Sequence, residues 1–456
     1  MNDDSPKLEP MPRASFKKKA TVFATAFAAM LAVSILWTVN RSGSISDPPV
    51  SRNVDGVFYD NIAFNLNRGE GFLVDLQAQP WRETYVKANQ QQQSDLDYEW
   101  LLPVKGTGPT LLRSPAYPFA LAKIFQVSNH RYDVARIFGC VFVSLGLAMF
   151  LTFSALRWGY LPAVVGGATL SLDFSVMQSA GIIATESLAI LVFATTFLLV
   201  VKAWEKPTMG SWFIAGVGFS VLTLTRGIWS LGLLLLIVSA GVCFLPAIRN
   251  RWETLRWSHL AVFLVAAILF AMPWWARNCM TTGHFTPFGL AGSCGFVAGY
   301  CDESLANHGQ WQPDVFNRNQ IEVQQNVDMD TIRLADLEYM TGQESVRKTK
   351  AWCLANWKRI PELMLARGLS HWGFYNAEVP WIFQIGNVVL VAVGLLGCFI
   401  FTGSVRGIFI VVLLLDSLLV MLTWEHLGRY AIPIRPLVHL GYGLAISWLV
   451  RLFSKT

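Results

Sequence analysis

The dominant pattern along this chain is a series of long apolar runs separated by short polar segments. A helix that crosses a bilayer needs about 20 apolar residues, and about ten runs approach or reach that length. They cover residues 20–39, 135–156, 160–180, 183–203, 211–226, 227–247, 258–276, 381–402, 407–424 and 435–452. The pattern predicts an all-α polytopic membrane protein with about ten transmembrane helices.

Two longer and more polar stretches, 40–134 and 277–380, interrupt this series. They divide the chain into an N-terminal tail, a transmembrane core that includes the first loop, a second loop and a C-terminal group of transmembrane helices. The expected bounds of these four regions are 1–19, 20–276, 277–380 and 381–456. Both loops contain helical patterns and are expected to form juxtamembrane helices.

The composition agrees with a membrane protein. Hydrophobic residues make up 53% of the 456 positions and charged residues 14%, against about 25% charged residues in soluble domains. The basic flank before the first apolar run resembles that of a secretory signal, but the run is long for a signal peptide and lacks an obvious cleavage site. We therefore expect a retained first span. The net charge of +6 is interpreted as topology information, not as a nucleic-acid footprint.

Lysine and arginine fall on one side of the predicted spans. These residues are Lys17, Lys18, Lys19, Arg157, Lys202, Lys206, Arg249, Arg251, Arg256, Arg406, Arg451 and Lys455. Short loops rich in Lys and Arg face the cytoplasm, so both termini are predicted there. The two large loops are then extracytoplasmic.

A short helix with two acids is predicted directly after the first span. Its apolar residues, Phe58, Ile62 and Leu66, recur every fourth position, and glycines follow. A partly shielded carboxylate at Asp55 can take a proton from an attacking hydroxyl or hold Mg²⁺ or Mn²⁺; alternatively it complements the helix dipole. Asp60 lies roughly 140° further around the helix and is expected to face solvent.

Several arginines are predicted at the same outer face. Arg113 precedes a proline-rich bend, and Arg277 follows the aromatic pair Trp274–Trp275. Each guanidinium can fork onto a phosphate, or snorkel to the membrane surface. Glu186 and Arg226 stand at span ends, where ionisable groups mark a site or pair with each other. The last outer corner contains Glu425, His426, Arg429, Tyr430 and Arg435.

The second loop combines cysteines with a helical stripe. Cys140, Cys243 and Cys398 fall inside predicted spans, whereas Cys279, Cys294, Cys301 and Cys353 fall in the loop. An oxidising compartment allows up to two disulfides there in three connectivities, of which Cys294–Cys301 is favoured. A loose apolar stripe at Leu334, Leu337, Met340, Val346, Trp352, Leu354 and Trp357 predicts helices that lie over the membrane face.

Taken in order, six segments resemble a known family. They are DGVFYDNIAFNLNRGEGF, RSPAYPFALA, ATESLAIL, LTRGIWSLGLLLL, PWWARNCMTTGHFTPF and GRYAIPIRPLVHLGYGL. The ordered set resembles the protein O-mannosyltransferase and aminoarabinose-transferase-like group of type C glycosyltransferases. The resemblance implies transfer of a sugar, with inversion, from a polyprenyl-phosphate carrier (undecaprenyl in bacteria, dolichyl in eukaryotes) at the outer face. It also implies a bacterial inner membrane in preference to the endoplasmic reticulum.

The resemblance also suggests roles for individual residues. The catalytic acid corresponds to Asp55, and Tyr59 falls on an aromatic position of the same motif. Arg113, Arg277 and Arg429 are expected to bind the donor phosphate, and Glu186 and Arg226 to support the site. Many members have a second acid where this chain has Gly56, so no metal or other cofactor is assigned beyond a candidate divalent cation at Asp55.

Two other classes of function compete with a transferase. A transporter or lipid flippase is expected to carry charges near the bilayer midplane and often has broken helices; the sequence pattern predicts neither. A scaffold or receptor would bind a partner through its two outer loops without catalysis. The expected partners are a polyprenyl-phosphate-linked sugar, an unidentified acceptor (protein, lipid or glycan) and the bilayer, with no nucleic acid.

Overall fold

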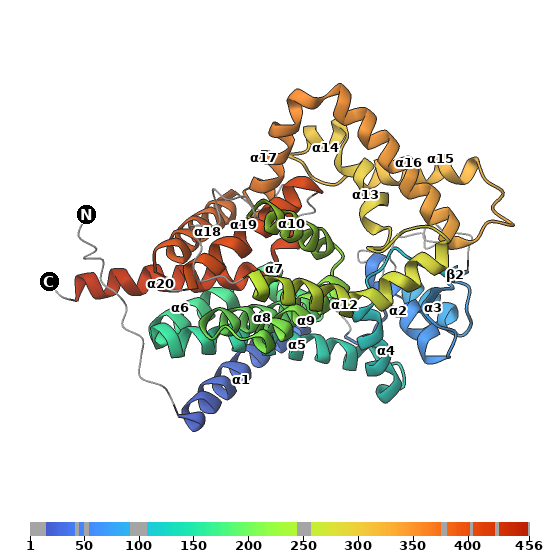
Figure 1. The fold of residues 1–456 in the computed structure, drawn as a ribbon. Helices are drawn as coiled ribbons and strands as arrows, with labels where there is room; N and C mark the ends of the chain where they lie inside the picture. Colours follow the sequence, from blue (N-terminus) through green and yellow to red (C-terminus); the bar gives the residue numbers. More distant parts are fainter. Residues whose placement is uncertain are drawn as a thin grey trace.

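The chain is an all-α polytopic membrane protein, shown as a ribbon in Figure 1. The computed structural model describes residues 15–41, 45–49, 54–91, 107–243, 257–374, 381–401, 405–424 and 428–454. The helices are α1 (Phe16–Arg41), α2 (Val54–Asn67), α3 (Trp81–Gln91), α4 (Ala116–Ser128), α5 (Tyr132–Trp158), α6 (Tyr160–Ser171), α7 (Phe174–Gly181), α8 (Thr185–Glu205), α9 (Met209–Thr225), α10 (Ile228–Cys243), α12 (Trp257–Thr282), α13 (Ala291–Gly299), α14 (Asp302–Ala306), α15 (Pro313–Gln325), α16 (Leu334–Ala355), α17 (Ile360–His371), α18 (Trp381–Phe401), α19 (Arg406–Leu422) and α20 (Arg435–Phe453). Among the described residues there are also two short 3₁₀ helices, η2 (Trp357–Arg359) and η4 (Arg429–Ala431), and an antiparallel pair of two-residue strands, β1 (Leu73–Val74) and β2 (Gly108–Pro109).

Each of the ten apolar runs contains helix. Among the described residues, five helices are long and apolar enough to cross a membrane, namely α1, α5, α8, α12 and α20. The bent pair α6 and α7 passes the same test only when the two helices are taken together, which brings the number of spans to at most six among the described residues. The helices α9, α10 and α18 contain apolar stretches of 10–17 residues, which are shorter than these spans. The helical membrane architecture is therefore confirmed, while the number ten stays a prediction.

The predicted span over 160–180 consists of two helices in the structure. The chain bends by 66° between α6 and α7. Asp173 causes the new start: it adopts an extended backbone and its carboxylate accepts a hydrogen bond from the Val176 amide at 3.1 Å, as an N-cap residue does. The apolar pattern on both sides conceals this break.

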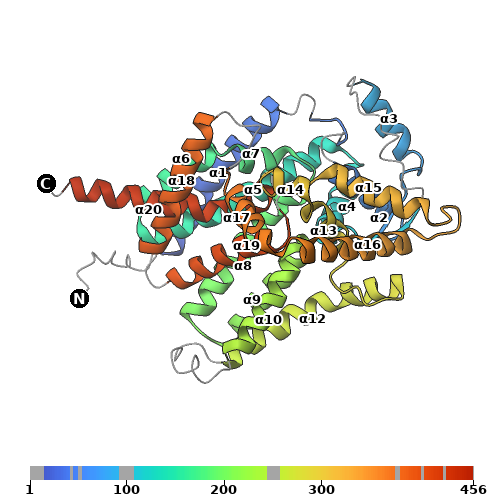
Figure 2. The ribbon, with the colours of Figure 1, turned by 90° about the horizontal axis from the view of Figure 1, so that it is seen from above.

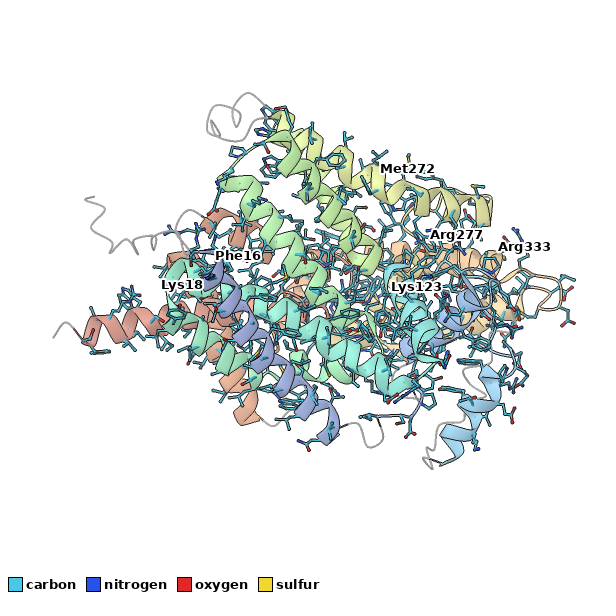
Figure 3. All side chains as sticks on the ribbon, turned by 90° about the horizontal axis from the view of Figure 1, so that it is seen from below. Phe16, Lys18, Lys123, Met272, Arg277 and Arg333 are labelled. Atoms are coloured by element: carbon cyan, nitrogen blue, oxygen red, sulfur yellow. The ribbon has the colours of Figure 1, made fainter. Side chains whose placement is uncertain are left out.

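The predicted basic end of the molecule is assembled in space. The Lys18 ammonium lies 5.8 Å from the centre of the Tyr160 ring, and Arg157 at the end of α5 pairs with Glu205 at the end of α8. Figure 3 shows Lys18 and Arg277 at opposite ends of the molecule. Lys18, predicted for the cytoplasmic side, and Arg277, predicted for the outer side, therefore lie toward different ends, while the orientation in the membrane stays a prediction.

Glycines allow the tightest helix contact, between α18 and α20. A Cβ at Gly394 would overlap the carbonyl oxygen of Val438, and one at Gly441 would overlap that of Gly394. Gly397 faces the backbone of Gly441 in the same way. Small residues permit this approach in membranes, where helices associate by packing rather than by hydrophobic burial.

The outer elements gather at the end opposite to Lys18. Helices α13 to α16 lie above α2 and α12 in Figure 1, and Figure 2 shows α15 and α16 running side by side over this end. Leu334 and Leu337 of the predicted stripe are buried. The later members Met340, Val346, Leu354 and Trp357 are exposed. The helical prediction is confirmed; of the later members, Trp352 is half-buried and its indole N–H donates to Asp302 at 3.0 Å.

The favoured Cys294–Cys301 disulfide is not formed. Both residues are free thiols, because each is directed at a different backbone group. The Cys294 thiol donates to the Glu338 carbonyl oxygen at 3.3 Å, and the Cys301 sulfur accepts from the Ser304 amide at 3.3 Å. The side chain of Cys243 lies outside the described residues.

Candidate active site at the head of the first outer helix

The helix α2 carries the candidate acid, and its ends are fixed locally. It begins at Val54 and ends at Asn67, after which Gly69 and Gly71 adopt positive φ angles of 80° and 92°. Such angles favour glycine and stop the helix. The inner face of α2 is buried, so the helix is held in one orientation.

The carboxylate of Asp55 lies between two arginines from distant parts of the chain. Arg113 Nη1 is 3.0 Å from Asp55 Oδ1, and Arg429 Nη1 is 2.9 Å from Asp55 Oδ2. The Asp55 side chain is 26% exposed. A carboxylate with a guanidinium beside each oxygen is held in one orientation, and its partial exposure leaves it accessible to another molecule.

A second acid lies behind this pair. Glu186, in the first turn of α8, accepts from Arg429 Nε and is 3.8 Å from Arg226 Nη2. The expected pairing of Glu186 with Arg226 is present, and Arg429 connects it to Asp55. Glu186 and Arg226 are both buried, whereas Arg429 reaches the exposed side of the cluster.

Aromatic rings flank the guanidinium groups. The Arg113 guanidinium lies 4.9 Å from the Phe58 ring centre and 5.8 Å from that of Tyr59, and the Arg226 guanidinium lies 5.0 Å from that of Tyr430. These are cation–π distances. Tyr59 is buried against Tyr117, and burial, with a smaller contribution from the Asp55 charge, raises the pKa of its hydroxyl.

The cluster favours an anionic ligand. Its described members are three guanidiniums (Arg113, Arg226 and Arg429) and two carboxylates, which leaves one positive charge in excess. Burial opposes the charge of Arg429, but the nearby Glu186 and Asp55 carboxylates outweigh it and raise its pKa. The Nε of Arg113 is buried and has no hydrogen-bond partner among the described residues. A phosphate oxygen would satisfy such a donor.

A divalent cation does not fit this cluster. Both Asp55 oxygens face guanidinium groups, so a metal would have to displace an arginine. The described residues contain no group of three His, Cys, Asp or Glu side chains that could hold a metal ion.

Arg277 occupies a different place. Its guanidinium donates to the carbonyl oxygens of Thr110 and Phe72, both at 2.8 Å, and lies 4.9 Å from the Trp274 ring centre. The structure therefore brings Asp55, Tyr59, Arg113, Glu186, Arg226 and Arg429 together and leaves Arg277 beside the β1–β2 pair.

The expected solvent-facing position of Asp60 is wrong. Its side chain is 0% exposed and accepts hydrogen bonds from Trp81 Nε1 at 2.8 Å and from the Tyr132 hydroxyl at 2.9 Å. His130 Nε2 lies 2.8 Å from its other oxygen. The three partners come from α3 and from the α4–α5 junction, so Asp60 anchors the side of α2 away from Asp55.

The rest of the last outer corner forms a separate buried cluster. Arg435 Nε donates to Asp173 at 2.6 Å, and His439 Nε2 lies 2.9 Å from the same carboxylate oxygen. Arg435 also donates to Asn387 at 2.7 Å. Glu425 and His426 lie outside the described residues. Sequence analysis missed Asp173, which looks like one acid within an apolar run.

Comparison with known proteins adds two structural similarities. No family model matches the sequence, and no curated protein matches it. The crystal structure of ArnT from Cupriavidus metallidurans bound to undecaprenyl phosphate is similar over 94% of this chain and 78% of that chain, with 13% sequence identity and a TM-score of 0.41. The apo state of the same protein gives 93%, 78%, 13% and 0.39. At these values the similarity assigns no residue, substrate or activity to this chain.

Proposed function

We propose that this protein is a glycosyltransferase that moves a sugar from a polyprenyl-phosphate carrier to an acceptor at the extracytoplasmic membrane face, with inversion. One observation carries the proposal: the Asp55 carboxylate is held by Arg113 and Arg429, in a cluster with an excess of positive charge. The site lies at the end of a membrane protein, where a lipid-linked phosphate and a water-borne acceptor can meet.

The chemistry follows from the two kinds of group. Asp55 accepts the proton of the acceptor hydroxyl while that oxygen attacks the anomeric carbon. The new bond from oxygen to C1 forms as the bond from C1 to the carrier phosphate breaks. Arg113 and Arg429 stabilise the charge that develops on the departing phosphate. Glu186 and Arg226 hold Arg429 in position.

The donor and the acceptor are proposed only as classes. An undecaprenyl carrier in a bacterial inner membrane fits the proposal better than a dolichyl carrier in the endoplasmic reticulum. The acceptor is a hydroxyl or amine of a protein, a lipid or a glycan. Arg277 is left out of the proposed phosphate site because its donors bind backbone carbonyls.

The test compares lipid-linked sugars, by mass spectrometry, in cells that lack this protein and express Asp55→Asn or Glu70→Gln. Glu70 pairs with Arg68 on the exposed end of the same segment, so it is a matched control. We expect one prenyl-phosphate sugar to accumulate with Asp55→Asn and to be consumed with wild type and Glu70→Gln. Consumption at the wild-type rate by a folded Asp55→Asn variant would refute the proposal.

A transporter or flippase is the second candidate, and two observations favour it. The helices α6 and α7 meet at a bend of 66°, and ionisable pairs are buried at Asp173–His439 and His371–Asp416; sequence analysis predicted neither feature. His439 lies one helical turn from the start of α20, about 6 Å along the axis, whereas Asp416 lies near the middle of α19. Lipid translocation that survives Asp55→Asn in vesicles would support this alternative.

A further inference from the structure

We propose that Glu338, on the second outer loop, is a positioning residue that holds the Thr110–Arg113 segment so that the Arg113 guanidinium reaches Asp55. This inference rests on the proposed function, because it assigns Glu338 an effect on transfer. Glu338 belongs to α16, far from α2 in the sequence, and it does not touch the proposed substrates.

The carboxyl group of Glu338 accepts hydrogen bonds from two consecutive residues. The Thr110 hydroxyl donates to Glu338 Oε1 at 2.7 Å, and the Leu111 amide donates to Glu338 Oε2 at 2.7 Å. The side chain is buried, with 6% of the residue exposed. One carboxylate thus satisfies a side-chain donor and a backbone donor on a segment without regular secondary structure.

Two further hydrogen bonds, from other elements, hold the same segment. Arg277 on α12 donates to the Thr110 carbonyl at 2.8 Å, and the Leu290 amide, just before α13, donates to the Leu111 carbonyl at 3.0 Å. The segment is therefore bonded from α12, α13 and α16. Glu338 is the carboxylate that holds Thr110 and Leu111, while Asp55 receives Arg113 at the end of the same segment.

The segment that Glu338 holds leads directly to the candidate site. Arg113 follows Leu111 by two residues, and its Nη1 is 3.0 Å from Asp55. The helix α4 begins shortly after, at Ala116. A shift of the segment would move Arg113, and a displacement of about 1 Å in a catalytic site can cost roughly 100-fold in rate.

The charged and titratable groups that face Glu338 are Arg113 on the segment, Arg277 on α12 and Cys294 on α13. Burial raises the pKa of Glu338 to about 7, and the Leu111 amide, Thr110 and the two arginines only partly oppose this. A buried acid with so large a desolvation cost is poorly explained by packing alone.

The experiment measures hydrogen exchange and transfer kinetics on the full-length protein in nanodiscs. The variants are Glu338→Gln and Thr110→Val, with Thr110→Ser and Glu344→Gln as controls. Thr110→Ser keeps the hydroxyl, and Glu344 lies on the same helix in a surface pair with Arg347. Thr110→Val supplies the test if Glu338→Gln fails to fold.

We expect the Leu111 amide to exchange at least about tenfold faster in Glu338→Gln. We expect kcat to fall about 10- to 100-fold in Glu338→Gln and Thr110→Val, with less than about a threefold change in KM for the lipid donor. Both controls should behave as wild type.

Unchanged exchange at Leu111, or faster exchange with unchanged kcat, would overturn the assignment. Failure of the proposed function has a different signature, namely transfer that survives Asp55→Asn. In that case the exchange comparison still decides whether Glu338 holds the segment.

Discussion

Asp55 and Arg429 lie 374 residues apart in the sequence, and their side chains meet at 2.9 Å. Arg429 also contacts Glu186 through its Nε. One guanidinium therefore connects two carboxylates from different helices, and the geometry of the candidate site depends on that single planar group.

Replacing Arg429 by lysine should impair transfer strongly. A lysine ammonium is a point charge and cannot reproduce the planar bridge from Asp55 to Glu186. We expect kcat to fall about 100-fold, measured with equal amounts of folded protein. Arg429→Lys combined with Asp55→Asn should be no worse than Asp55→Asn alone, because the two residues act together. Fully additive losses would contradict this; Arg68→Lys, at an exposed position, is the control.

Replacing Asp60 by asparagine should destabilise the protein without touching the candidate site. The change replaces a buried carboxylate that accepts hydrogen bonds from Trp81 and Tyr132 and contacts His130. We expect a loss of about 2–4 kcal/mol, measured as a lower Tm in detergent. Asp133→Asn, which breaks a surface pair with Arg131, should have little effect. Equal shifts for the two variants would show that the Asp60 network contributes nothing.

The stability of the protein should depend on pH through Glu338. Its pKa is about 7 in the folded state, against 4.5 as the ordinary value. Between these values the folded chain retains a proton that the unfolded chain has lost, so the Glu338 contribution falls as pH rises through this window. From pH 5 to pH 8 the Tm of the wild type should decrease relative to that of Glu338→Gln. The corresponding loss in the free energy of unfolding is at most about 3 kcal/mol. A pH-independent difference would contradict the raised pKa.

Cys294 and Cys301 should remain unpaired and react slowly. Burial raises the pKa of both thiols, that of Cys301 to about 11, and a thiolate is the reactive form. We expect both thiols to be alkylated slowly in the native protein. After denaturation without reductant, both should be alkylated completely, as read by peptide mass spectrometry. A non-reduced peptide map that contains a Cys294–Cys301 bridge would refute the expectation.

The parts of the fold that local sequence encodes could be predicted. The apolar runs predicted helices, and the spacing of apolar residues together with Gly69 and Gly71 predicted α2. The pairing of Glu186 with Arg226 could be anticipated because isolated charges near a membrane are costly. These features depend on residues close in sequence or on the bilayer itself.

The parts that depend on distant contacts could not be predicted. Asp60 looked like a solvent-facing acid because its partners lie on other elements, at Trp81, His130 and Tyr132. Glu338 gave no signal within a mixed helical stretch, since its donors are at Thr110 and Leu111. Arg113 and Arg277 looked equivalent in sequence, and only the three-dimensional arrangement separates them.

The seam between α18 and α20 limits how a long lipid could enter. Gly394, Gly397 and Gly441 bring the two backbones into direct contact, so these three positions carry no side chain whose rotation could open a gate. The two helices should move together as one rigid body. An isoprenoid tail would therefore have to slide in along another side of the bundle, and a crosslink across this seam should leave its passage unaffected.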